Sequence, residues 1–255
     1  MSIITKLASL AFLLSLLSLS NVRADQSLVT DISSHLISVT SDFTGTDLLL
    51  FGTIESVREN NPARHGDIII AVRGPHKDLL VRKKERILGI WANTKAVDVS
   101  HIPGFFALAS NKPIEEIADQ GTLERLKLGP DRLSFNSQNP GEEFDLFKEA
   151  IIRQRENENL FTINEKGVQF LGNQLFRASI HFPANVPVGN YVSEVYFFED
   201  GDLVSAQTSP LFIKKFGLGR TIYDFANQYP ALHGIIAIIF ALVAGWIASA
   251  VFRKD

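Results

Sequence analysis

Apolar residues are concentrated in two long runs at opposite ends of the chain. The first run, residues 7–19, would be roughly 20 Å long as a helix, which is too short for a bilayer core of about 30 Å. Lys6 precedes this run, and the small residues Val22 and Ala24 follow it. This pattern predicts a secretory signal peptide over residues 1–24, with an uncleaved N-terminal anchor as the alternative.

The second run, residues 231–252, has 22 residues without a formal charge and would be about 33 Å long as a helix. It lacks the polar stripe that a buried helix of a soluble protein shows. We therefore predict a transmembrane helix over residues 230–252, followed by a tail at 253–255 that carries Arg253 and Lys254. Because the signal exports the body of the protein, the tail is expected in the cytoplasm.

The segment before this helix, residues 216–229, has the pattern of a helix that lies in the membrane interface. Its apolar residues recur at spacings of three and four positions and so share one face. These residues are Ile222, Phe225, Ala226 and Tyr229. We predict an amphipathic juxtamembrane helix, and a plain linker is the alternative.

Residues 25–110 show β patterns. Two short apolar runs rich in branched residues, 47–54 and 67–72, predict strands that are covered on both faces. Turn signals recur about every 8–12 residues, which is typical of an immunoglobulin-like β-sandwich. Further strands are expected at residues 35–40, 79–82, 88–93 and 105–109.

Residues 111–158 change to a helical pattern, with short helices predicted at 113–117 and 122–126. A longer helix is expected to begin with Asn139 as its N-cap and Pro140 in its first turn. The expected buried face of this helix consists of Phe144, Phe147 and Ile151.

Residues 159–215 return to a β pattern. Strict alternation over residues 176–182 predicts a half-buried strand, and Asp200-Gly201 predicts a hairpin turn. This block is either a second β module or the completion of the first. The predicted fold class is therefore mainly β, with immunoglobulin-like β-sandwich modules, a helical middle segment and one C-terminal transmembrane helix.

Net charge and cysteine content narrow the function classes. The predicted signal carries two of the 25 basic residues and no acidic one, which changes the formal charge from −3 to −5 in the mature chain. An acidic chain without a concentrated basic face argues against nucleic acid as a partner. The chain has no cysteine, which excludes disulfides, thiolate metal sites and a cysteine nucleophile.

No catalytic, cofactor-binding or metal-ligating residue is assigned from the sequence. A phosphate-binding glycine loop, a nucleophile elbow and a His-Glu-x-x-His helix are all missing. The six histidines are scattered singly, and Asp42, Asp47 and the acidic segment 199–202 are interpreted as turn residues rather than calcium ligands. We expect no cofactor and favour a protein that is not an enzyme.

One segment, residues 73–86, concentrates basic side chains. In an extended strand, Arg82, Lys84 and Arg86 share one face. Such a face suits anionic lipid headgroups or an acidic partner, and a solvated edge strand protected by its charges is the alternative. Trp91, a few residues later, is predicted to lie in the core.

The predicted transmembrane helix carries a ridge of small residues, spaced four apart. These are Ala237, Ala241, Gly245 and Ser249. Small residues at this spacing allow close packing of helices in a bilayer, so the ridge predicts association with another copy or with a partner helix. The alternative is that alanine and glycine are simply common in such helices.

Several separated stretches resemble a known family. The stretches are residues 72–75, 84–93, 103–110, 175–180, 183–191 and 245–253. They resemble a family of alphaproteobacterial transmembrane proteins, and the likeness extends over nearly the whole mature chain. The resemblance implies an inner-membrane protein with its body in the periplasm. It transfers no catalytic or binding residue.

Two function hypotheses follow. The first is a membrane-anchored periplasmic accessory or interaction protein, associated with an inner-membrane partner such as a transporter. The second is a membrane-anchored periplasmic enzyme or small-ligand-binding protein with a site built from loops. The expected partners are the lipid bilayer, through the C-terminal helix, and a membrane protein or a second copy of the chain.

Overall fold

The structure is a computed structural model that describes residues 27–55, 66–137, 140–141, 143–172, 174–216 and 218–252. The predicted signal peptide and the tail at 253–255 lie outside these residues.

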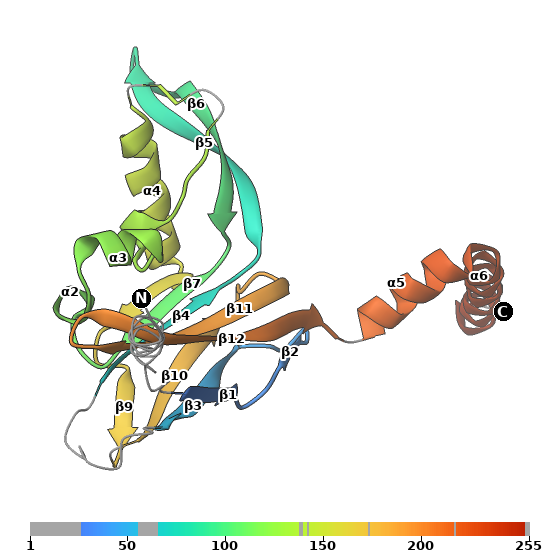
Figure 1. The fold of residues 1–255 in the computed structure, drawn as a ribbon. Coiled ribbons are helices and arrows are strands. Elements are labelled where there is room, and N and C mark those ends of the chain that lie inside the picture. Colours follow the sequence, from blue (N-terminus) through green and yellow to red (C-terminus); the bar gives the residue numbers. More distant parts are fainter. Residues whose placement is uncertain are drawn as a thin grey trace, which may run out of the picture.

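Two β-sheets form a sandwich around one hydrophobic core (Figure 1). The first sheet has the order β1 (Ser27–Ile32), β3 (Gly45–Glu55), β10 (Leu175–Pro183), β9 (Val168–Leu171), and all of its pairs are antiparallel. The second has the order β2 (Leu36–Val39), β12 (Asp202–Lys215), β11 (Gly189–Glu199), β4 (Asp67–Arg73), β7 (Phe106–Ser110), β8 (Phe161–Asn164). Both sheets combine strands from the first and the last β block of the sequence. The predicted fold class is confirmed.

One strand is predicted to be half-buried and two are predicted to be covered on both faces, and the outcomes differ. On β10, Phe176, Ala178, Ile180 and Phe182 are buried between the sheets, and the residues between them are exposed, as predicted. On β4 the residues from 68 to 72 are all fully buried, because helices cover the outer face of the central strand.

The prediction that β3 is covered on both faces is wrong. Leu48 and Leu50 are buried, whereas Leu49 and Phe51 are exposed on the outer side of the sheet. The reason is that β3 lies in the four-stranded sheet, whose outer face is open to solvent (Figure 1).

Tyr191, near the start of β11, closes the core at one end of the sandwich. Its ring packs against Phe105 and Phe182, with centroids 5.8 Å away from each. Its hydroxyl donates a hydrogen bond of 2.5 Å to the carbonyl of Pro187, four residues upstream, and burial raises the pKa of the phenol. This contact resembles the tyrosine corner of immunoglobulin-like sandwiches.

The helical segment covers the outer face of the six-stranded sheet and supports the long hairpin. It comprises α2 (Ile114–Ile117), α3 (Gln120–Arg125), the 3₁₀ turn η2 (Pro130–Arg132) and α4 (Phe144–Asn157). Both short helices are confirmed. The long helix begins at Phe144, later than predicted, since Pro140 and Gly141 are not helical and Asn139 lies outside the described residues. Phe147 and Ile151 are buried as expected, together with Ile152.

A long β-hairpin projects from the sandwich beside α4 (Figure 1). It consists of β5 (His76–Ile87) and β6 (Ile90–Pro103), which pair along their length as a separate two-stranded sheet. The two short strands predicted at 79–82 and 88–93 are parts of these longer strands, except that Leu88 and Gly89 belong to the turn.

Two helices follow the sandwich at the C-terminus. These are α5 (Leu218–Gln228) and α6 (Pro230–Phe252). With 23 residues, α6 is about 34 Å long, which is enough to cross a bilayer core. It is the one helix in the described ranges that is long and apolar enough for this, and the body buries none of its apolar stretch Pro230–Ser249.

Candidate functional site

The far end of the β5–β6 hairpin carries a cluster of exposed apolar side chains, which we call the hairpin tip: Ile87, Leu88, Ile90 and Trp91. Leu88 is 98% exposed, Ile90 73% and Trp91 67%. The prediction that Trp91 lies in the core is wrong, because the hairpin carries it away from the sandwich (Figure 1). Monomeric proteins rarely expose a group of large apolar residues without a binding role.

The turn at the tip has an unusual first residue. Ile87 pairs with Ile90, so Leu88 and Gly89 form a two-residue turn, with φ values of 50° and 88°. Two positive φ angles define a type I′ turn, which strongly prefers Asn-Gly or Asp-Gly. A leucine in the left-handed region costs roughly 1–2 kcal/mol. The leucine therefore makes the turn less stable and also exposes an apolar side chain.

On the inner face of the hairpin, two lysines hold the start of α4. Glu143, the residue before the helix, accepts from Nζ of Lys95 at 2.9 Å and from Nζ of Lys83 at 3.5 Å. The hydrogen bond from Lys95 lowers the pKa of the Glu143 carboxyl, and the hydrogen bond to Glu85 raises the pKa of Lys83. These pairs connect the outer half of the hairpin to α4.

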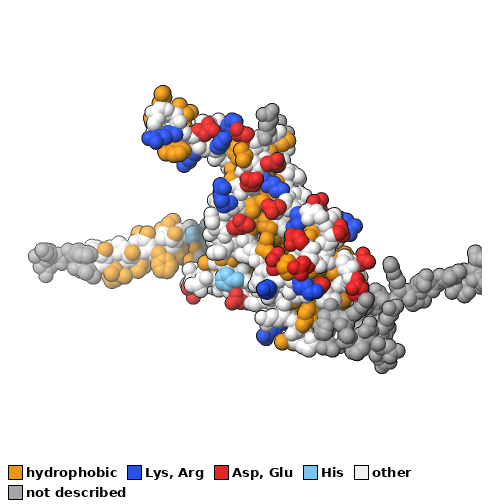
Figure 2. All heavy atoms as spheres, turned by 90° about the vertical axis from the view of Figure 1, so that its left-hand side faces the viewer, with side chains coloured by type: hydrophobic (Ala, Val, Ile, Leu, Met, Phe, Trp, Pro, Cys, Tyr) orange, Lys and Arg blue, Asp and Glu red, His pale blue; other side chains and the backbone are white. Residues whose placement is uncertain are grey.

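The opposite face of β5 carries Arg82, Lys84 and Arg86, which alternate with less exposed residues. The structure thus places the three predicted residues on one exposed face, and their role in binding stays a prediction. Among the described residues none of the three has an acidic partner within salt-bridge distance, and Arg86 Nε donates only to the Gly89 carbonyl at 3.4 Å. Figure 2 shows basic and apolar side chains together at the end of the hairpin.

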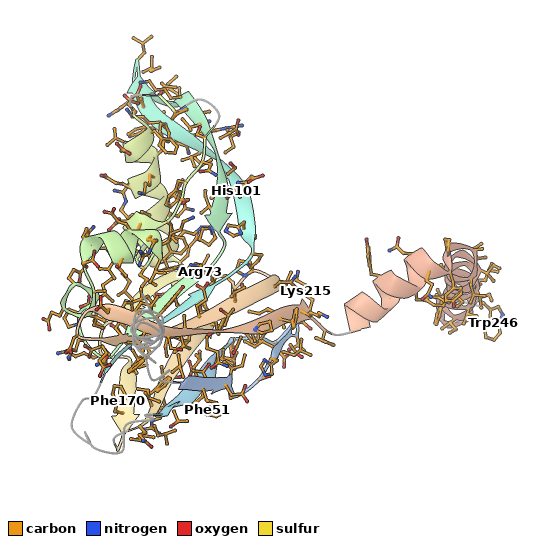
Figure 3. The ribbon with its side chains drawn as sticks, viewed as in Figure 1. Phe51, Arg73, His101, Phe170, Lys215 and Trp246 are labelled. Carbon is orange, nitrogen blue, oxygen red and sulfur yellow. The ribbon has the colours of Figure 1, made fainter. Side chains whose placement is uncertain are left out.

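Arg73, the first basic residue of the segment 73–86, has a different position. It forms an ion pair with Glu194 on β11, and its Nη2 donates to the carbonyls of Leu126 and Lys127 at 2.8 and 3.2 Å. Figure 3 shows it where the hairpin joins the six-stranded sheet. Desolvation lowers its pKa, although a guanidinium remains charged. Arg73 fastens α3 to the sheet and does not extend the basic face.

The small residues of α6 lie uncovered along the helix. Ala237, Ala241, Gly245 and Ser249 are all exposed, and so are large apolar residues such as Trp246, which projects away from the body in Figure 3. A Cβ atom added to Gly245 would meet no heavy atom within 4 Å. No contact among the described residues requires a glycine at this position.

The junction between α5 and α6 is held by aromatic contacts. The Phe225 ring lies 6.0 Å from that of Tyr229 and 6.1 Å from that of His233, measured between centroids. Ile222 and Tyr229 are exposed, and Phe225 and Ala226 are half-buried. Ile222, Phe225 and Ala226 of the predicted stripe thus lie on α5, whereas Tyr229 follows the end of the helix at Gln228. The place of the stripe in the membrane interface stays a prediction.

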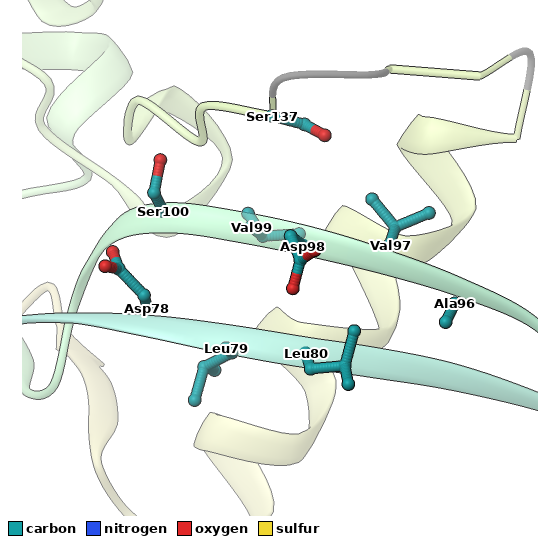
Figure 4. Close-up of a pocket in the computed structure, with 9 residues that line it drawn as sticks. All are labelled: Asp78, Leu79, Leu80, Ala96, Val97, Asp98, Val99, Ser100 and Ser137. Carbon is teal, nitrogen blue, oxygen red and sulfur yellow. The ribbon is translucent and has the colours of Figure 1, made fainter.

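A groove of about 510 Å³ lies between the base of the hairpin and the segment at Ser137 (Figure 4). Its polar lining consists of Asp78, Asp98, Ser100 and Ser137, and its apolar lining includes Leu79 and Val99. The Ser100 amide donates to the Asn136 carbonyl at 2.7 Å, which holds the segment against β6. The groove is large enough for a small polar ligand.

The described histidines form single pairs with carboxylates or other rings. His181 Nδ1 lies 2.7 Å from an oxygen of Asp47, and the rings of His76 and His101 are 6.0 Å apart. Within the residues that the structure describes, no three His, Asp or Glu side chains gather as metal ligands would. The segment at 199–202 forms the predicted hairpin turn, with φ of 53° at Asp200 and 91° at Gly201.

The sequence pattern does not place Leu88 in the turn of the hairpin tip. Its pattern predicts a strand, because Leu-Gly is not one of the residue pairs that usually mark a two-residue turn. A leucine at that position hides the signal, because turn prediction relies on Asn, Asp or Gly.

The β-sandwich body and the exposed, apolar C-terminal helix define the class of a membrane-anchored protein. Residues 27–254 match the family described as "Putative transmembrane protein (Alph_Pro_TM)", and the chain belongs to this family. A comparison with curated proteins finds no match.

Proposed function

We propose that this chain is an accessory protein of the bacterial inner membrane, which associates through α6 with a membrane partner such as a transporter. In this proposal the body lies in the periplasm, α5 lies in the membrane interface, and the C-terminus lies in the cytoplasm. The bilayer and the partner are its ligands, and it performs no reaction of its own.

The observation that carries the proposal is that no described residue packs against Gly245 on the surface of α6. Glycine inside a helix is less stable than alanine by up to about 1 kcal/mol. Because an added Cβ at this position would meet no described residue outside the backbone of the helix, its small size has no benefit within the described protein. A close approach of another transmembrane helix over the ridge supplies such a benefit, through dispersion contacts and weak hydrogen bonds between backbones.

A membrane two-hybrid or crosslinking assay in the native host tests this role. Ala241→Leu and Gly245→Leu should abolish association, because a leucine separates the backbones along the ridge. Leu242→Ala is the matched control on another face and should leave association unchanged. Equal association in all three variants would reduce α6 to a tether.

The proposed orientation has a separate test. A reporter fused after Asp255 should be active only in the cytoplasm, and one fused after Asn136 only in the periplasm. The reversed result would contradict both the periplasmic location of the body and the proposed orientation of the chain relative to its partner.

The groove at the hairpin base favours a second candidate function, binding of a small ligand. Asp78 and Asp98 bring two carboxylates to its wall, and Ser100 and Ser137 add hydroxyls, so a small cation with polar groups fits best. A thermal-shift screen with polyamines and cationic amino acids tests it. An increase in Tm that disappears in Asp98→Asn supports the candidate, and no increase with any compound removes it.

A further inference from the structure

We propose that the hairpin tip is a second membrane contact, which enters the surface of the anionic bilayer that holds α6. In this arrangement Leu88, Ile90 and Trp91 enter the boundary between headgroups and acyl chains. Arg82, Lys84 and Arg86 lie behind them and bind lipid phosphates.

The apolar part of this contact has the shape and composition of a bilayer-inserting loop. The tip is convex, since it is the end of a two-stranded hairpin, and its side chains point outward from a two-residue turn. Tryptophan is enriched at the membrane–water interface, where its ring is accommodated between apolar and polar layers. The unfavourable leucine in the left-handed region and its 98% exposure have a common reason if Leu88 is buried in lipid.

The basic part complements an anionic surface. Of the basic residues near the tip, Lys83 and Lys95 are paired with Glu143 on the inner face. Arg82 and Lys84 have no acidic partner in the described part of the chain and lie on the outer face, next to the apolar group. Clusters of basic residues beside an apolar insertion are the electrostatic signature of binding to anionic lipid.

The anchor brings the tip within reach of the bilayer. Because α6 tethers the body to the membrane, a weak second contact forms at a high effective concentration. In Figure 2 the apolar rod of α6 leaves the body on one side, and the end of the hairpin leans toward that same side. The ion pairs of Lys83 and Lys95 with Glu143 connect the hairpin to α4.

The test uses the full chain with Trp246→Phe. Of the two tryptophans in the sequence, only Trp91 then remains. The protein is reconstituted in vesicles of phosphatidylcholine, with and without an equal amount of phosphatidylglycerol. In vesicles that contain phosphatidylglycerol, brominated phosphatidylcholine should quench the fluorescence of Trp91. Iodide dissolved in the water should not quench it in these vesicles. Full quenching by iodide with none by brominated lipid would overturn the proposal.

Three variants separate the parts of the contact. Leu88→Asn keeps the turn and should reduce quenching by brominated lipid. Replacing Arg82, Lys84 and Arg86 by glutamine should lower the ratio of inserted to free tip roughly fivefold for each residue changed, and only with phosphatidylglycerol. Leu175→Asn removes an exposed leucine from β10 instead and should change nothing.

A protein partner for the tip is one outcome of the test. If Trp91 is protected from iodide only when other membrane proteins of the host are added, and never by lipid alone, the lipid assignment is wrong. Failure here leaves the role of α6 untouched, because the crosslinking of Gly245 variants does not involve the tip.

Discussion

The hairpins β5–β6 and β11–β12 have the same kind of turn and opposite surroundings. In each, a residue with φ near +50° precedes a glycine with φ near +90°: Leu88-Gly89 in one and Asp200-Gly201 in the other. The β11–β12 hairpin is part of the six-stranded sheet, and Phe197 and Phe198 are buried just before its turn. The β5–β6 hairpin leaves the sandwich and exposes the apolar residues on both sides of its turn.

The two turns show which requirement determines a residue. Asp200 is a residue type that the type I′ geometry itself prefers, so it suits the local backbone. Leu88 is unfavourable for the backbone and is almost fully exposed among the described residues. This difference agrees with the proposal that the hairpin tip is a binding surface.

The largest expected difference between the two hairpins is in the free energy of unfolding when a large aromatic residue near each turn is replaced by alanine. Phe198→Ala should lower the free energy of unfolding by about 3–5 kcal/mol, since the ring is fully buried and its removal leaves a cavity. Trp91→Ala should change it by less than about 0.5 kcal/mol. Urea denaturation of the purified chain measures both, and a loss of several kcal/mol in Trp91→Ala would show that the tip belongs to the core.

Exchange of the turn residues should have a smaller effect of opposite sign in the two hairpins. Leu88→Asn should stabilise the protein by up to about 1 kcal/mol, because asparagine tolerates the left-handed region. Asp200→Leu should destabilise it by roughly 1 kcal/mol for the same reason. Thermal unfolding of the two variants gives the signs, and destabilisation by Leu88→Asn would mean that Leu88 has a structural contact.

The smallest effect is a pH dependence confined to the β5–β6 hairpin. The folded-state pKa of Glu143 lies below its ordinary value of 4.5, so its ion pairs contribute fully above that value and are lost as the pH falls through the lower folded pKa. Hydrogen exchange at Lys83 and Lys95 should therefore accelerate at acidic pH. Glu143→Gln should weaken this pH dependence after correction for the intrinsic exchange rate, and the remaining Glu85–Lys83 ion pair accounts for the part that is left.

Much of the fold was predictable because its signals are local. The alternation on β10 has a period of two residues, and the Asp200-Gly201 turn depends on two residues alone. The apolar run of α6 predicts a spanning helix from its length, whatever surrounds it. The shared face of Arg82, Lys84 and Arg86 likewise follows from strand geometry.

The sequence by itself therefore determined the class of elements, the apolar C-terminal helix and the face on which the basic residues lie. Only the tertiary structure decided which apolar residues remain exposed. Leu50 and Leu49 are neighbours in one apolar run, yet the first is buried and the second is not, because a second sheet covers one side of β3 only. Trp91 is exposed because β6 extends beyond the sandwich, and Arg73 is withdrawn from the basic surface because Glu194 lies on the neighbouring strand. Burial depends on what covers a residue from elsewhere in the chain, and no local pattern contains that information.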